Sequence, residues 1–294
     1  MNRLKKPSAY DHTDRPVPVS MVKMSRSYDD QILPLPFRRS VVDLSLLTGT
    51  NCYCDREAAA VIRSAIEELP VCAVHLIDSG NYHYLTRLWL ERIRDPFLLV
   101  VFDNHTDMQA PAFGDLLSCG GWAASAAAEL KALRGILMAG PDGESVRQAD
   151  RDCADRTVFV TERELKASKA EAFREGLLLA WKKFGDESRQ SDGKPVGIYL
   201  SVDKDILCRE DAVTGWSQGE MRIEELTQCI AVLADFCSSK GVPLLGADIC
   251  GELEDSPEAD RVNGRANAML IRTILEAGFW RNVEERSGGQ TLEK

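Results

Sequence analysis

Acidic and histidine residues gather directly after an apolar run near the middle of this chain. Residues 98–102 (LLVVF) are followed by Asp103, His105 and Asp107. Side chains two residues apart lie on the same face of an extended segment, so these three can converge at the end of a strand. Two carboxylates and an imidazole that converge in a buried place destabilise one another unless a cation compensates their charge. The cluster therefore predicts a metal-binding site.

Two further stretches repeat this arrangement. Residues 198–202 (IYLSV) run into Asp203 and Asp205, and residues 71–77 are followed by a turn with Gly80 and then by His83. Glycine permits the positive φ of a tight turn, so His83 is expected to open the next helix and to face the edge of the sheet. Alone, an acidic pair can be a helix cap, and a histidine can be an ordinary hydrogen-bonded residue. Together with the first cluster, both stretches favour a shared metal site.

The elements that must position these residues alternate along the chain. Alternating strands and helices predict βαβ crossovers and an α/β fold, a single three-layer α-β-α domain with a mainly parallel, doubly wound sheet. Ligands bind at the carboxyl ends of such strands, where the clusters lie. The expected strands are residues 41–47, 72–77, 97–102, 135–139, 157–160, 196–202 and 244–249, and the expected helices are residues 55–69, 164–184, 223–239 and 267–277.

Three segments make up the expected domain organisation. Residues 1–40 contain several prolines and little periodicity, so they are predicted to be an extended N-terminal arm. Residues 41–280 form the metal-binding domain, and residues 281–294 form a C-terminal tail. The polar stretch 186–194 is expected to be an exposed loop within the domain.

Composition narrows the classes of partner. The chain has 294 residues, 44% of them hydrophobic, and a formal net charge of −10. Nucleic acids and anionic membranes bind basic surfaces, so both are excluded as expected partners, and a small cationic molecule is favoured. The absence of a long apolar run and of a signal sequence predicts a cytoplasmic protein. In that compartment the nine cysteines are expected to be reduced thiols. Whether the chain forms a homo-oligomer is left open.

The three stretches resemble, in order and spacing, the metal-binding motifs of the arginase (ureohydrolase) family, which includes agmatinases and formimidoylglutamases. The motifs are G-x-x-H at 80–83, D-x-H-x-D at 103–107 and S-x-D-x-D at 201–205, and a weaker match is D-I at 248–249. The resemblance extends from about residue 41 onward and implies an arginase-like fold.

The resemblance also implies two Mn²⁺ ions per chain. It assigns one ion to His83, Asp103, Asp107 and Asp203, and the other to His105, Asp103, Asp203 and Asp205, so that Asp103 and Asp203 bridge. A shell of carboxylates and imidazoles suits Mn²⁺ better than a thiolate-seeking ion. The implied activity is hydrolysis of a linear C–N bond in a guanidino or formimino compound by a hydroxide shared between the ions, which releases urea or a related small product. Asp107 is then expected to accept the proton of the nucleophile.

The sequence departs from the family pattern in two places. The relay histidine that many members carry shortly after D-x-H-x-D has no counterpart in residues 114–122, and Gly251 stands where the family has a glutamate after D-I. Glu252 is the nearest acid and is predicted to anchor the substrate, although a solvated loop acid explains it equally well. The other candidate substrate-binding residues are Gln109, Ser118 and Asn51, and an ordinary turn explains Asn51 equally well.

Two alternatives remain beside the hydrolase. The missing histidine is compatible with a catalytically degenerate protein that keeps the scaffold for binding or regulation. A single-metal, deacetylase-like hydrolase of the same superfamily is the other, although such a site does not need the full second set of ligands.

Overall fold

A single parallel sheet forms the centre of the molecule. The computed structural model describes residues 19–31, 39–110, 116–185 and 196–277. Eight strands lie in the order β2-β1-β4-β10-β9-β5-β7-β8, and every pair is parallel. Their bounds are β1 Val19–Lys23, β2 Arg39–Asp43, β4 Val74–Leu76, β5 Phe97–Phe102, β7 Leu133–Ala139, β8 Thr157–Val160, β9 Gly197–Asp203 and β10 Leu244–Cys250. The predicted α/β class with a mainly parallel sheet is confirmed.

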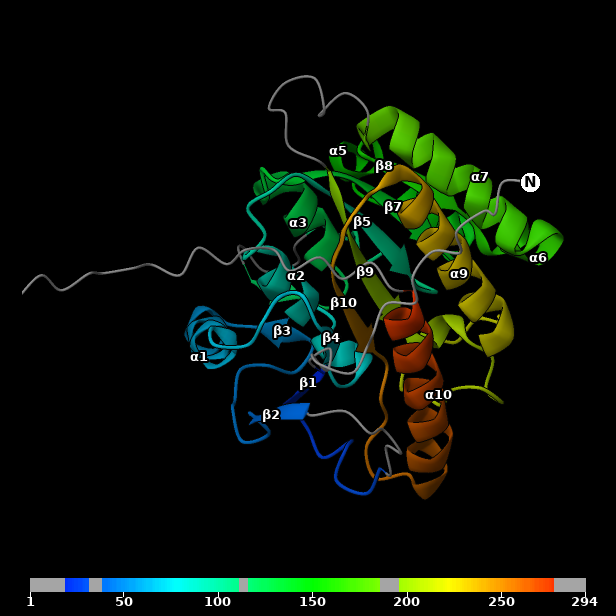
Figure 1. The fold of residues 1–294 in the computed structure, drawn as a ribbon. Helices are drawn as coiled ribbons and strands as arrows, with labels where there is room; N and C mark the ends of the chain where they lie inside the picture. Colours follow the sequence, from blue (N-terminus) through cyan, green and yellow to red (C-terminus); the bar gives the residue numbers. More distant parts are fainter. Residues whose placement is uncertain (1–18, 32–38, 111–115, 186–195, 278–294) are drawn as a thin grey trace, which may run out of the picture.

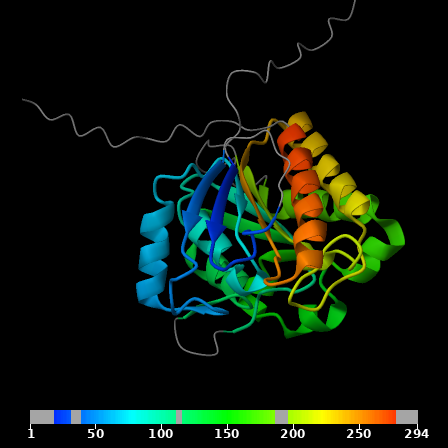
Figure 2. The ribbon, with the colours of Figure 1, turned by 90° about the horizontal axis from the view of Figure 1, so that it is seen from below.

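Helices cover both faces of the sheet (Figures 1 and 2). One face packs against α1 (Arg56–Ile66), α2 (Leu85–Leu90) and α3 (Trp122–Glu129), and the other against α7 (Ala170–Ala180), α9 (Ile223–Lys240) and α10 (Pro257–Glu276). Each side has its own apolar cluster, which explains why β5, β9 and β10 are buried along their whole length. The remaining helices are α4 Gly143–Gln148, α5 Arg151–Ala154 and α6 Glu162–Ser168.

Two helical predictions differ from the structure. The expected helix 164–184 is divided at Lys169, whose φ of 50° ends α6 and begins α7. Its last turns, Trp181–Gly185, are a π-helix. The expected helix 267–277 begins earlier, at Pro257, because Ser256 accepts a hydrogen bond from the Ala259 N–H and Pro257 fits the first turn.

The predicted N-terminal arm contains a strand of the sheet. β1 lies between β2 and β4 in parallel register, and Val19, Met21 and Val22 are buried. The prediction that the domain begins at residue 41 is wrong, because β1 belongs to the central sheet. The short length of β1 and the prolines around it hide the strand in the sequence. Residues 1–18 and 32–38 of the arm, the loop 186–194 and the tail 281–294 lie outside the described residues.

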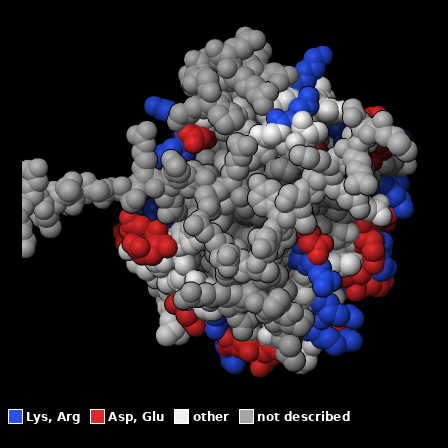
Figure 3. Space-filling model, in the orientation of Figure 1, with Lys and Arg blue, Asp and Glu red and all other residues white. Residues whose placement is uncertain are grey.

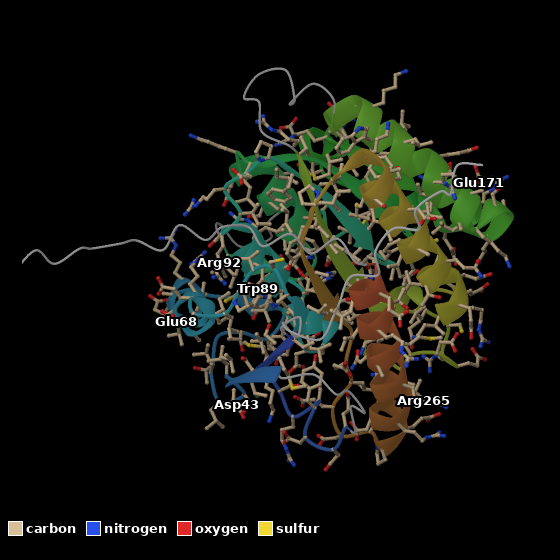
Figure 4. All side chains as sticks on the ribbon, in the orientation of Figure 1. Asp43, Glu68, Trp89, Arg92, Glu171 and Arg265 are labelled. Atoms are coloured by element: carbon tan, nitrogen blue, oxygen red, sulfur yellow. The ribbon has the colours of Figure 1, made fainter. Side chains whose placement is uncertain are left out.

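Aromatic packing holds α2 against the sheet. Trp89 stacks on the His75 ring of β4 with 3.7 Å between ring centroids, and Arg92 lies beside it, 5.3 Å from the ring (Figure 4). α2 begins at Leu85, two residues after His83, so this packing also helps to fix the backbone that carries the histidine. Acidic and basic side chains are interspersed along the edge of the face drawn in Figure 3. No helix in the described ranges is long and apolar enough to cross a membrane.

Candidate metal centre

The predicted metal residues meet at the carboxyl ends of neighbouring strands. His83 follows β4, Asp103 follows β5, and Asp203 ends β9. The sheet order places β4, β10, β9 and β5 side by side, although these strands are far apart in the sequence. Parallel strands end at the same edge, so the side chains that leave them converge there.

The first group of candidate ligands surrounds the His83 imidazole. Its Nδ1 lies 3.0 Å from Asp107 Oδ2, 3.3 Å from Asp103 Oδ2 and 3.5 Å from Asp203 Oδ2. The histidine and all three carboxylates are almost fully buried. This is the set that the resemblance assigned to one ion.

The second group surrounds the His105 imidazole. Its Nδ1 lies 2.8 Å from Asp205 Oδ2 and 3.5 Å from Asp103 Oδ1. Asp103 therefore presents one oxygen to each group, as a bridging ligand must. Asp203 Oδ2 faces the first group, and Asp203 Oδ1 accepts the backbone N–H of Asp205 at 2.9 Å, as Asp103 Oδ1 accepts that of His105 at 2.6 Å.

Burial and the close packing of charges shift the pKa values of the groups in this site. Burial raises the pKa of Asp203 to about 6, and burial together with repulsion from Asp203 and Asp103 raises the pKa of Asp205 well above its ordinary value. Burial lowers the pKa of His105, but its bonds to Asp103 and Asp205 outweigh this and raise it to about 11. The neighbouring carboxylates therefore favour positive charge at this point of the structure, which is the charge that a bound cation supplies.

These donors fit divalent metal ions. Two overlapping sets, His83 with Asp103 and Asp107, and Asp103 with His105 and Asp205, each bring their ligand atoms within 4.8 Å of one another. Asp103 Oδ2 is buried, with no hydrogen-bond partner of good geometry among the described residues. Four carboxylates in a buried site match the charge of two divalent ions, and oxygen with imidazole ligands suits a hard or borderline metal.

A further layer of hydrogen bonds orients the ligands. The Trp122 indole N–H donates to Asp107 Oδ2 at 2.6 Å, and His83 Nε2 lies 3.0 Å from Ser201 Oγ. The Ser201 hydroxyl in turn donates to Asp248 Oδ1 at 2.6 Å. Asp248 belongs to the weak D-I match, and its role here is to hold the serine that faces His83. Such contacts fix the orientation of metal-binding side chains.

A cavity of about 330 Å³ opens onto the two groups. Among the predicted substrate-binding residues, Gln109 and Ser118 line this cavity, and so does the predicted catalytic Asp107. Asn51 is not among the lining residues; its Oδ1 accepts a hydrogen bond from Asn81 Nδ2 at 2.8 Å behind the rim.

The structure does not place Glu252 at the cavity. The carboxylate is 1% exposed and forms a buried ion pair with Lys204, and Asn267 Nδ2 donates to it at 2.8 Å. These contacts keep the carboxylate out of the cavity lining, which speaks against its predicted role as substrate anchor. Gly251, at the family's glutamate position, has a φ of 92°, and a Cβ there would lie 2.6 Å from Asp203 Oδ1.

Two features of the site were missed in the sequence. Trp216 lines the cavity, and its ring lies 5.9 Å from that of His105 in an edge-on arrangement. It comes from the loop between β9 and α9, where no periodicity marks it. Cys250, at the end of β10, lies near His83 and Asp203. Burial raises the pKa of its thiol well above the ordinary value, and the thiol donates to the Ser79 carbonyl, so it is a neutral neighbour of the site.

Comparison with known proteins identifies the fold. No family model matches the chain. An uncharacterised protein of Thermotoga maritima is 28% identical over 232 residues, which cover 75% of this chain and 73% of that protein.

Solved structures give a closer architectural match. The formiminoglutamase of Trypanosoma cruzi, solved with Mn²⁺, has a TM-score of 0.63 at 12% identity. The match covers 92% of this chain and 96% of the formiminoglutamase chain. A hypothetical agmatinase of Burkholderia thailandensis has a TM-score of 0.58 at 18% identity. The match covers 92% of this chain and 90% of the agmatinase chain. The chain therefore has the fold of the arginase, agmatinase and formimidoylglutamase structures, as the motifs predicted.

Proposed function

We propose that this chain is a ureohydrolase, a hydrolase that cleaves a linear C–N bond of a guanidino or formimino compound. It would use two divalent metal ions, and Mn²⁺ is the ion that we propose. The observation that carries the proposal is the sharing of Asp103 between two sets of ligands at the floor of a cavity. The ureohydrolase fold supports it, since the three motifs occupy the strand ends of that fold.

Each residue of the site then has a defined task. His83, Asp103, Asp107 and Asp203 hold one ion, and His105, Asp103 and Asp205 hold the other. Asp203 would contribute to the first ion through Oδ2, which faces His83. Bound divalent ions supply a nucleophilic oxygen near neutral pH, because they lower the pKa of water.

Asp107 is the candidate proton acceptor. It lines the cavity, and its Oδ2 is oriented by the Trp122 N–H. Its φ of 50° is unusual for an aspartate, and this conformation turns the side chain from the end of β5 toward His83. The carboxylate is thus fixed where it can take a proton from the attacking oxygen and give it to the departing amine.

The test combines metal analysis with a substrate panel. The protein is loaded with Mn²⁺, the ions per chain are counted, and release of urea, ammonia or formamide is measured with arginine, agmatine, guanidinobutyrate, formiminoglutamate and guanidine. We expect about two ions per chain, by two-metal chemistry, and turnover of at least one compound of the class. Asp103→Asn should abolish turnover, whereas Asp43→Asn, the same change at an exposed strand end, should not.

Two outcomes would favour the alternatives. No more than one tightly bound ion would support the single-metal, deacetylase-like hydrolase. A fully loaded protein that turns over no linear amidine would support the degenerate binding protein.

A further inference from the structure

The described part of the cavity wall above the metal residues carries no charged side chain. Among the described residues that line it, every carboxylate and the one imidazole belong to the two candidate ligand groups. The rest of the lining consists of amides, hydroxyls, thiols, glycines and aromatic rings. Its largest polar and aromatic members are Gln109, Ser118, Ser145, Gln148, Tyr53 and Trp216.

Glu252, the acid that follows the end of β10, is not part of this wall. Gly251 leaves no side chain at the end of β10, and a Cβ there would meet Asp203. Glu252 is turned into the ion pair with Lys204, and Gln31 Nε2 donates to its second oxygen at 2.5 Å. Both carboxylate oxygens therefore have partners, and the carboxylate is not available to a bound molecule.

A fixed aromatic ring stands beside the reacting centre. The Trp216 indole N–H donates to Asn81 Oδ1 at 3.0 Å, and the ring lies against Gly80, where a Cβ would come within 2.7 Å of it. Its side chain remains 39% exposed at the cavity. A ring held in this way offers a flat apolar surface with little conformational entropy to lose on binding.

The uncharged lining and the fixed Trp216 ring together favour one kind of substrate. A tail with an ammonium or carboxylate group would lose hydration in the cavity without gaining a charged partner from the described wall. An uncharged tail can pack on Trp216 and bond to the Gln109 amide without that penalty.

We propose that the substrate is a linear amidine or guanidine whose non-reacting end carries no charge and packs flat against Trp216. This rests on the proposed function and narrows it to substituted guanidines with neutral alkyl or aryl tails, in place of amino-acid or diamine derivatives.

The experiment compares compounds that share the reacting group and differ only in the tail. N-butylguanidine, agmatine and guanidinobutyrate have tails of similar length that are neutral, cationic and anionic, and N-benzylguanidine adds a ring. With the Mn²⁺-loaded protein we expect kcat/KM for the neutral compounds to exceed that of both charged ones by at least about tenfold, or about 1.4 kcal/mol. Calorimetric affinities for the same loaded protein should follow the same order.

The outcomes separate this inference from the function on which it rests. If a charged compound is the best substrate, the enzyme proposal stands and the neutral-tail proposal fails. If no compound is hydrolysed but the neutral compounds bind most tightly, the neutral-tail proposal stands and the hydrolase proposal fails. If no compound binds, both fail.

Charge insertion gives an independent test. Gln109→Lys should raise the preference for guanidinobutyrate over N-butylguanidine, and Gln109→Glu the preference for agmatine, each by up to about fivefold, the range of an exposed ion pair. Gln228→Lys and Gln228→Glu, the same changes on the exposed side of α9, should leave both ratios unchanged. Unchanged ratios in the Gln109 variants would overturn the assignment of this wall to the substrate tail.

Trp216 has its own pair of variants. Trp216→Leu should raise KM for N-benzylguanidine about two- to fivefold while metal content stays the same, and Trp216→Phe, which keeps a flat ring, should restore most of the loss. Equal KM values in all three proteins would contradict packing of the tail on this ring.

Discussion

The buried ion pair between Lys204 and Glu252 gives a quantitative test of how the carboxyl edge of the sheet is held together. The side chains are 0% and 1% exposed. Lys204 Nζ also donates to Asn267 Oδ1 at 2.9 Å, and Gln31, from the segment after β1, donates to the other oxygen of Glu252. Lys204 lies between two candidate metal ligands, so this cluster ties the end of β9 to β10, α10 and the N-terminal segment.

The change is Glu252→Gln, which keeps the shape of the side chain and removes its charge. Removal of one partner of a fully buried pair leaves the other charge uncompensated, and this costs about 3–5 kcal/mol. We therefore expect a loss of about this size in the free energy of unfolding. A substrate-anchoring role for Glu252, as expected from the sequence, would instead predict a loss of turnover with the metal ions still bound.

Urea unfolding of the metal-free protein measures this loss without a contribution from metal binding. Lys204→Met should be destabilising as well, and the double variant should be more stable than the sum of the two single losses predicts, because it leaves no isolated charge. Glu220→Gln is the matched control: its partner is Lys166, its side chain is 74% exposed, and its effect should stay within about 0.5 kcal/mol. A loss below about 1 kcal/mol in Glu252→Gln, the value of an exposed pair, would refute the reasoning.

Three further predictions follow from single contacts. Trp122→Phe removes the N–H that orients Asp107 and should weaken Mn²⁺ affinity about 10- to 100-fold; an unchanged dissociation constant in a metal titration would show that the bond does not position the ligand. Burial lowers the pKa of His75 to about 3, so the unfolded chain binds one proton more between about pH 3 and 6.5. Stability therefore increases as the pH rises through this window, by up to about 1.4 kcal/mol per unit. In urea unfolding at several pH values, His75→Gln should therefore show a slope shallower by one proton, and identical slopes would contradict a neutral, buried imidazole. Cys52→Ser with Cys54→Ser should keep the full metal content by elemental analysis, since neither thiol belongs to a candidate ligand group; loss of an ion would identify one as a ligand.

Local sequence determined the strand ends and the residues that leave them. The run before Asp103 is apolar on both faces, as a strand covered by helices on both sides must be, and β5 is indeed buried throughout. The alternation of such runs with amphipathic stretches fixed the α/β class. In D-x-H-x-D the directions of the side chains follow from the local extended backbone, because residues two apart share a face. These side chains could therefore be assigned to one site from the sequence.

Contacts between distant segments were decided only by the tertiary structure. Lys204 and Glu252 are 48 residues apart, and no local pattern distinguishes an acid that faces a substrate from one that neutralises a buried lysine. Trp216 reaches the cavity from a loop without periodicity, and β1 is a strand because β2 and β4 lie on either side of it. The physical reason is the same in each case: periodicity and turn propensity act over a few residues, whereas charge pairing, burial of a ring and pairing of short strands depend on neighbours that only the completed sheet supplies.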